Sequence, residues 1–240
     1  MENIESQLQK AERLYHEGDK KTAFELFLML SKKGNAVAQT SLGFMYQNGE
    51  AFENENEIIK PDYATAKMWF EEAVKQEQPI AYFNLGILYA NGMGLDVDLT
   101  TAFNLFLKSA ILEVPDAQFE VALMLEEGKG CNQNYSESAF WYEESAKRGN
   151  REAFNNLGIL YKDGLGVHQS YEKAVHLFTK AVQMHSHEAM YNLGFMFDKG
   201  FGVEQNPEQA LALCRQASYL GNSKAQKVIH HLQETGQLAF

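Results

Sequence analysis

The chain contains few of the features that mark secreted or membrane-embedded proteins. It has only two cysteines, Cys131 and Cys214, which lie far apart in the sequence and in no metal-ligand spacing. It has no run of about 18 apolar residues, so no membrane-spanning helix is expected. Its first residues do not combine a basic segment with an apolar one, so we expect no signal peptide. Isolated thiols fit a reducing compartment, and we therefore expect a cytoplasmic protein.

Basic residues are also scarce. The sequence has 21 lysines and arginines against 32 aspartates and glutamates, which gives a formal net charge of −11. An acidic protein repels nucleic-acid phosphates and anionic membranes, so we expect neither as a partner. Basic proteins, basic peptides or cations are the partners that this charge favours. With 45% hydrophobic residues, the chain can still bury a core.

The chain does contain an internal repeat with a period of about 36 residues. The six residues NLGILY occur at 84–89 and again at 156–161. Halfway between them stands EVALML at 120–125, and one period further on stands NLGFMF at 192–197. A related SLGFMY at 41–46 precedes the first copy by a longer step, because that unit carries about seven additional residues in its loop.

Each unit has the pattern of two helices joined by a loop. In residues 81–92 the apolar positions recur at three- and four-residue steps, and Gly92 ends the helical pattern. The loop that follows ends in a side chain that can accept a hydrogen bond from a free backbone N–H, and we predict that this residue caps the second helix. The predicted N-caps are Asp62, Asp98, Asn134, Ser170 and Asn206.

These units resemble the Sel-1-like repeat family, a branch of the tetratricopeptide-like α-solenoids. The resemblance is carried by AFNNLGILYKDGLGV at 153–167 and by WYEESAKRGN at 141–150. It implies an all-α fold, a right-handed α/α superhelical solenoid of helix hairpins that binds other proteins. It also implies a bacterial source, from the distribution of the family. We expect a single solenoid domain over residues 1–240, with five repeats over 35–221 and a C-terminal capping helix and tail over 222–240.

Two departures from the family pattern have structural consequences. Residues 1–34 lack the G-x-G-V loop, so this segment is expected to form an ordinary tetratricopeptide-like hairpin. Ala122 replaces the usual glycine of the third full unit, and we expect it to push the paired helices slightly apart.

The first helices of such solenoids line a concave surface, as the resemblance implies, and polar residues gather on one side of them. We predict that this surface binds a protein or peptide, with the acidic groups attracting a basic partner and the amides bonding its backbone. Two other interpretations remain open. The face carries polar residues because it is exposed to solvent, or the asparagines serve helix packing. The predicted partner-binding residues are Asn84, Asn91, Asp116, Glu120, Glu127, Glu152, Asn156, Asp163, Glu188 and Asn192.

The insertion at 47–61 is the alternative binding site. It reads QNGEAFENENEIIKP, in which Glu53, Glu55 and Glu57 alternate with asparagines. An insertion in one unit of a solenoid often contacts a partner, although a longer surface loop is also tolerated at little cost. Apolar residues in it, Phe52 and the pair Ile58-Ile59, predict that part of the segment folds back onto the solenoid.

We find no catalytic constellation, and we predict a protein that is not an enzyme and has no cofactor and no metal. The histidines do not form a ligand set, and the G-x-G loops lack the Lys-Ser/Thr of a phosphate loop. The predicted function is an adaptor or scaffold that binds its partner on the concave, acidic face. The alternative is an immunity or inhibitor protein that neutralises a toxin. We expect a monomer rather than a dimer, although the apolar tail Leu238-Ala239-Phe240 is suited to docking on a second copy.

Overall fold

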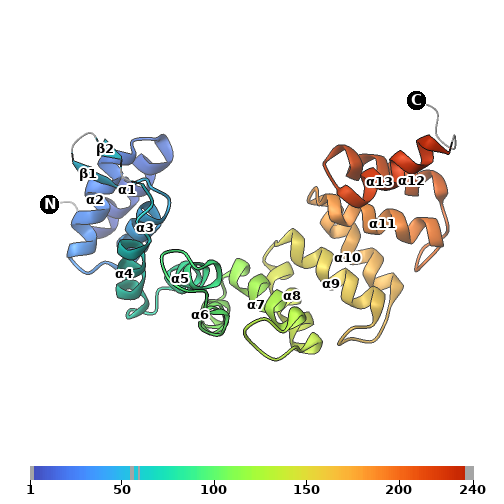
Figure 1. Cartoon of the computed structure of the whole chain (residues 1–240), viewed down its shortest axis with the longest axis horizontal. Helices are drawn as coiled ribbons and strands as arrows, with labels where there is room; N and C mark the ends of the chain where they lie inside the picture. The colour runs from blue at the N-terminus through green and yellow to red at the C-terminus, as the bar shows by residue number, and fades with distance from the viewer. Residues whose placement is uncertain (1–2, 55–56, 59, 236–240) are drawn as a thin grey trace. The chain divides into compact units, whose positions relative to one another are not determined.

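The computed structural model of the chain describes residues 3–54, 57–58 and 60–235. The described residues form helices joined by short loops, together with one pair of short strands (Figure 1). The strands β1 (Phe52–Asn54) and β2 (Glu57–Ile58) pair antiparallel within the insertion. The helices are α1 (Ile4–Glu17), α2 (Lys20–Lys32), α3 (Ala36–Gln47), α4 (Tyr63–Val74), α5 (Pro79–Asn91), α6 (Leu99–Ile111), α7 (Pro115–Glu127), α8 (Tyr135–Lys147), α9 (Arg151–Asp163), α10 (Tyr171–Gln183), α11 (His187–Lys199), α12 (Pro207–Tyr219) and α13 (Ser223–Glu234).

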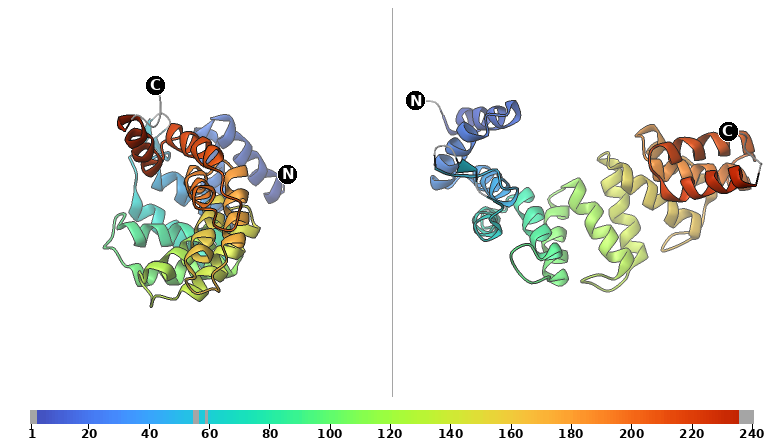
Figure 2. Two further views of the ribbon diagram at one scale, coloured as in Figure 1. Left: turned by 90° about the vertical axis from the view of Figure 1, so that its right-hand side faces the viewer. Right: turned by 45° about the horizontal axis from the view of Figure 1, so that its top comes forward.

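The fold is an all-α solenoid whose helices fall into two compact units. The first unit comprises residues 1–117 and 129–131, and the second comprises residues 118–128 and 132–240. Inside each unit the helices pack mainly against their neighbours in sequence, as Figures 1 and 2 show. The all-α solenoid was correctly predicted, whereas the right-handed superhelix and the single domain stay predictions.

The loops end as the repeat pattern predicts. Asp62, Asp98, Asn134, Ser170 and Asn206 each accept a hydrogen bond from a backbone N–H three residues later, at the start of α4, α6, α8, α10 and α12. These bonds satisfy donors that a helix leaves free at its N-terminus. All five predicted N-caps are therefore confirmed, and they explain why the second helix of every unit begins at the same repeat position.

The N-terminal segment forms the predicted hairpin of α1 and α2. Gly18 has a φ of 93°, a left-handed conformation that ends α1, and Asp19 caps α2. The insertion is tied to this hairpin through Glu50, whose carboxylate accepts from the Tyr15 hydroxyl at 2.6 Å and pairs with the Lys20 ammonium at 2.5 Å. These two bonds fix the point where the inserted segment leaves α3.

The first residues of the insertion fold back onto the hairpin. Ala51 is fully buried, and the ring of Phe52 lies 5.9 Å from that of Phe24, so the prediction for Phe52 is confirmed. Glu55 and Ile59 lie outside the described residues, as do the side chains of Glu53, Glu57 and Ile58 and the tail residues 236–240.

Within a hairpin the two helices meet where a glycine faces an aromatic ring. A Cβ added at Gly158 would lie 2.6 Å from the ring of Phe178, so only glycine lets the helices approach this closely. The equivalent pairs are Gly43 with Phe70 and Gly86 with Phe106. In the third unit the pair is Ala122 and Tyr142, and both residues are buried. The predicted displacement of the helices at Ala122 stays a prediction.

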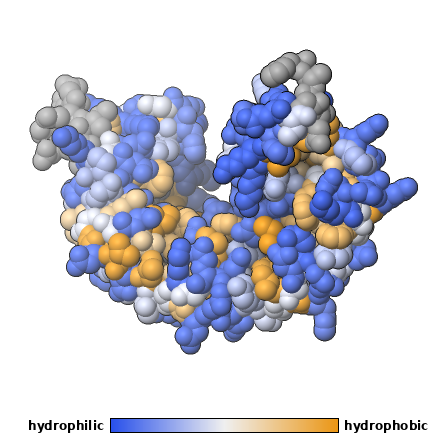
Figure 3. Space-filling model, turned by 45° about the vertical axis from the view of Figure 1, so that its right-hand side comes forward, coloured by the Kyte–Doolittle hydropathy of each residue, from blue (hydrophilic) through white to orange (hydrophobic). Residues whose placement is uncertain are grey.

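The face of the molecule that Figure 3 shows is largely hydrophilic, with hydrophobic side chains in areas between the polar ones. Within the described ranges, no helix combines the length and the apolar character that crossing a membrane requires.

Candidate functional site

A chain of hydrogen bonds links four helices of the second unit, and we call it the polar chain. The Asn192 amide on α11 donates to the Asn155 side-chain oxygen on α9 at 2.8 Å, and Asn155 donates to Asn156 at 3.1 Å. Asn156 donates in turn to the hydroxyl of Tyr142 on α8 at 3.1 Å. That hydroxyl donates to the Glu126 carboxylate on α7 at 2.7 Å. The polar chain therefore couples the first helices of successive repeats.

Tyr142 is a buried member of the polar chain, between Asn156 and Glu126. Its side chain is fully buried, and it occupies the position where the first, second and fourth repeats carry a phenylalanine ring. Burial, followed by the hydrogen bond to Glu126 and the charge of that carboxylate, raises the pKa of Tyr142 above its usual range. The hydroxyl consequently keeps its proton, so it serves as donor to Glu126 and as acceptor for Asn156.

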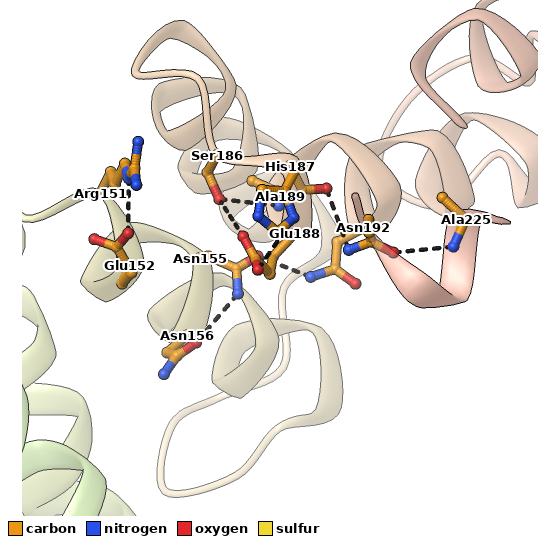
Figure 4. Close-up of polar contacts among 11 residues, drawn as sticks. Arg151, Glu152, Asn155, Asn156, Ser186, His187, Glu188, Ala189, Asn192 and Ala225 are labelled. Carbon is orange, nitrogen blue, oxygen red and sulfur yellow. Dashed lines mark hydrogen bonds and ion pairs between the residues drawn. The ribbon is translucent and has the colours of Figure 1, made fainter. Parts of the chain in front are cut away.

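At Asn192 the polar chain reaches a groove of about 330 Å³. Side chains of α9 and α11 form one part of it, and the start of α13 forms another, so we call it the α9–α11–α13 groove. The Asn192 side-chain oxygen has no hydrogen-bond donor among the described residues and remains available to a ligand. Asn155, Glu188 and Asn192 all line this groove, and Figure 4 shows the three side chains close together. Its lining residues are Asn155, Ile159, His187, Glu188, Tyr191, Asn192, Gly221, Asn222, Ser223 and Lys224.

The groove carries charges of both signs. The Glu188 side chain is 52% exposed, and its carboxylate lies 3.2 Å from the His187 ring nitrogen Nδ1 (Figure 4). Lys224 is exposed at the start of α13. Amide, carboxylate and ammonium groups can together bond the peptide backbone and charged side chains of a bound segment. The groove is therefore polar and mixed in charge rather than uniformly acidic.

The predicted partner-binding residues are divided between the two units. Glu188 and Asn192 line the groove, and Asn156 belongs to the polar chain beside it. The exposed carboxylates Glu152 and Asp163 each contact the cation next to them in sequence, Arg151 at 2.7 Å and Lys162 at 2.6 Å. In the second unit, Glu120 is half-buried and Glu127 is exposed.

Three predicted residues belong to the first unit. Asp116 is exposed, and the Asn91 amide donates to the backbone oxygen of Ile87 in its own helix. Asn84 is only 7% exposed, which argues against the interpretation that this position is polar because it is solvated. It lines a cavity of about 280 Å³ together with residues of α1, α2 and α3. The helix-packing interpretation of the asparagines has its support in the polar chain of the second unit.

Asn155 is one of the groove residues that sequence reasoning missed. It is 5% exposed and bonds to two other asparagines. Three equivalent repeat positions carry the aromatic residues Phe83, Phe119 and Tyr191. An amide at a position where three other repeats carry an aromatic residue was the signal, because a buried amide needs hydrogen-bond partners and so points to a polar contact.

Solved structures of other proteins resemble this chain over nearly its whole length. A Sel1 repeat protein from Oxalobacter formigenes is 25% identical and has a TM-score of 0.88, with coverage of 98% of this chain and 90% of the other. A protective antigen of uropathogenic Escherichia coli is 28% identical with a TM-score of 0.85 and 99% coverage of this chain. This chain spans half the length of that antigen.

An immunity protein from Pseudomonas aeruginosa shares the fold at 18% identity and a TM-score of 0.50, with coverage of 84% of this chain and 74% of the other. The Sel1 repeat model matches residues 36–77, 79–113, 115–150, 152–186 and 187–222. These five matches account for most of the sequence and begin and end close to the predicted repeat boundaries. The chain belongs to the Sel1 repeat family.

Proposed function

We propose that the chain is a non-enzymatic protein-interaction module, an adaptor or scaffold, whose second unit binds a segment of a partner protein in the α9–α11–α13 groove. The observation that carries the proposal is the open groove of about 330 Å³, which is lined by Asn192 and by its hydrogen-bond partner Asn155. Sel1 repeat proteins generally bind other proteins, which supports the same function. The cytoplasm is the proposed site of action.

The amides give the groove a way to hold peptide backbone. Asn155 is fixed by bonds to Asn156 and Asn192, so the groove side of Asn192 is held in place before a partner arrives. A preorganised acceptor loses little conformational entropy on binding, which favours affinity. Glu188 then selects for a basic residue in the bound segment, consistent with the net charge of −11.

Affinity capture from the native cell tests this function with a matched pair of charge reversals. Glu188→Lys changes the groove, whereas Glu208→Lys changes an exposed residue in the first turn of α12, outside the groove. Both glutamates lie in a first helical turn, so each charge reversal removes a similar favourable interaction between the carboxylate and the helix dipole. A partner retained by wild type and Glu208→Lys and lost by Glu188→Lys supports the proposal. Equal retention by both variants, with circular dichroism showing intact helices, contradicts it.

The same capture tests the wider acidic surface and the insertion. A triple variant, Glu120→Lys/Glu127→Lys/Asp163→Lys, changes predicted partner-binding residues of the second unit that do not line the groove. Loss of the partner from this variant alone places the contact on the wider acidic surface. Full retention by every variant leaves the insertion at 47–61 as the binding site.

A second candidate function is neutralisation of a toxic protein. Two observations favour it, the net charge of −11 and the fold shared with the P. aeruginosa immunity protein. Co-expression with the product of a neighbouring toxin gene provides the test. Protection that disappears in Glu188→Lys supports this role, whereas cells that die equally with and without the chain contradict it.

A further inference from the structure

Three repeats carry an asparagine directly before the Leu-Gly pair, at Asn84, Asn156 and Asn192. In the second unit Asn156 donates to Tyr142 and Asn192 donates to Asn155. Asn84 is only 7% exposed, yet its amide makes no hydrogen bond within the part of the chain that the structure describes. A buried amide without a partner has lost its bonds to water and gained none in return, so its presence needs an explanation.

The residues beside Asn84 explain why its amide is unpaired. In the second unit a tyrosine and an asparagine bond to this repeat position. The equivalent residues in the first unit are Phe70, which has no polar group, and Thr40, whose hydroxyl donates to the backbone oxygen of Ala36 at 2.9 Å. The contact that occupies the asparagine in other repeats is therefore missing here, and the amide of Asn84 is available to a ligand.

Asn84 lines a pocket of about 280 Å³ within the first unit. Phe27 and Met45 are buried lining residues, at 2% and 1% exposed. Phe44 and Ile80 also line it and are 38% and 44% exposed, so the pocket is open to solvent. Because small-molecule sites span about 300–1,000 Å³, this volume suits one apolar side chain with its peptide unit.

The polar groups of the pocket define which ligand fits. The Asn84 amide offers an oxygen acceptor and N–H donors, which match the N–H and C=O of one peptide unit. The Ser41 hydroxyl lines the same pocket and likewise has no hydrogen bond to a described residue. Glu12 is exposed and makes no ion pair in the described ranges, and the lining that the structure describes holds no lysine or arginine. Its carboxylate therefore attracts a cation.

We propose that this pocket is a second partner site, which takes one apolar side chain of a peptide segment. The peptide unit of that residue bonds to Asn84, and a neighbouring lysine or arginine faces Glu12. The bound side chain covers Phe44 and Ile80, which removes apolar surface from water. The site lies in the first unit and shares no residue with the α9–α11–α13 groove, so it is independent of the function proposed above. With both sites occupied, the chain joins two peptide segments.

The dipeptide N-acetyl-Leu-Lys-amide is the probe that tests this site. It is titrated at millimolar concentration into isotope-labelled protein, and NMR follows the side-chain amide signals. Those of Asn84 are expected to shift, whereas those of Asn156 and Asn192 stay in place. Glu188→Lys should leave the titration unchanged, which separates this site from the groove. No shift at Asn84, or a shift at Asn192 in its place, overturns the proposal.

Two matched probes examine the ligand chemistry. N-acetyl-Ala-Lys-amide lacks the apolar side chain and is expected to bind at least about tenfold more weakly. N-acetyl-Leu-Glu-amide meets Glu12 with a like charge and is expected to bind about fivefold more weakly. Equal affinity of all three probes contradicts the proposed ligand. Signals of Asn84 that move when the protein alone is diluted place a second copy in the pocket and overturn the proposal.

A pair of variants separates binding from folding. Asn84→Leu keeps the volume of the side chain and removes the unpaired amide, so it is expected to raise the melting temperature by about 2–4 °C. The same variant should weaken binding of the Leu-Lys probe about tenfold. Asn156→Leu is the matched control, and it should lower the melting temperature because Tyr142 loses a partner. A melting temperature lowered by both variants, or probe binding that survives Asn84→Leu, overturns the proposal.

Discussion

Asn192 on α11 donates a hydrogen bond to Asn155 on α9, and this contact joins the first helices of two successive repeats through buried or half-buried amides. Asn192 was predicted to contact a partner, and this stays a prediction. Its amide holds a neighbouring helix, and the same residue lines the groove.

The contact between Asn155 and Asn192 is expected to appear as an energetic coupling. Asn155→Ala leaves neighbouring polar groups without partners and is expected to lower the free energy of unfolding by about 1–3 kcal/mol. In a double-mutant cycle measured by urea denaturation, Asn155→Ala and Asn192→Ala are expected to couple by at least about 0.5 kcal/mol. Asn84→Ala, at the repeat position equivalent to Asn192, is the control. Its effect on the free energy of unfolding should be additive with that of Asn155→Ala. A coupling as large with Asn84 as with Asn192 would contradict the assigned contact.

The Tyr142 hydroxyl is expected to stabilise the second unit. Tyr142→Phe removes the donor to Glu126 and the acceptor of Asn156, at a cost of about 1–2 kcal/mol in the free energy of unfolding. Tyr161→Phe is the matched control, because the Tyr161 hydroxyl makes no hydrogen bond within the described part of the chain. Urea denaturation of both variants checks this, and equal losses would show that the polar chain contributes nothing.

Close approach of the helices in the fourth repeat predicts a strong response to one added methyl group. Gly158→Ala places a Cβ 2.6 Å from the Phe178 ring and is expected to destabilise the protein by about 1–3 kcal/mol. In a Phe178→Leu background the same change should cost less, since the opposing ring atoms are gone. Thermal unfolding of the four proteins tests the prediction, and an equal cost in both backgrounds would refute the packing argument.

Stability at alkaline pH depends on Tyr15. Burial, then the hydrogen bond to Glu50 and the charge of Glu50, raise the pKa of Tyr15 to about 12, whereas an unfolded tyrosine titrates near about 10. The folded state therefore holds this proton more tightly. Its contribution to stability is complete below about pH 10 and is lost as the pH rises through about 12.

The expected result follows from removing that hydroxyl. Between about pH 10 and 12, the free energy of unfolding of Tyr15→Phe should fall less steeply than that of wild type. Glu50→Gln should reduce the difference in slope, because it removes the charge that helps to raise the pKa of Tyr15. Parallel profiles for wild type and Tyr15→Phe, measured by denaturant unfolding at each pH, would contradict the assignment.

The repeat made the fold predictable, because each local signal occurs several times in the same register. A single residue such as Asn134 or Ser170 is an ambiguous N-cap. Five equivalent positions that all carry a side-chain acceptor identify where the second helix of each repeat begins. The binding residues were less predictable, since a helical wheel separates faces without showing which polar side chains bond to a neighbouring helix. Asn156 and Asn192 lie on the predicted face, yet their amides are directed by Tyr142 and Asn155, which belong to other helices.

The central claim is that a partner occupies the α9–α11–α13 groove, and site-specific photo-crosslinking tests it most directly. A photoreactive amino acid replaces Lys224, which lines the groove, or Lys227, which is exposed on the same helix outside it. Mass spectrometry then identifies what is joined to the chain in the native cell. We predict one protein cross-linked through position 224, absent at position 227, and reduced by Glu188→Lys. The same protein cross-linked equally at both positions, or at neither while it still co-purifies with the chain, would contradict the claim.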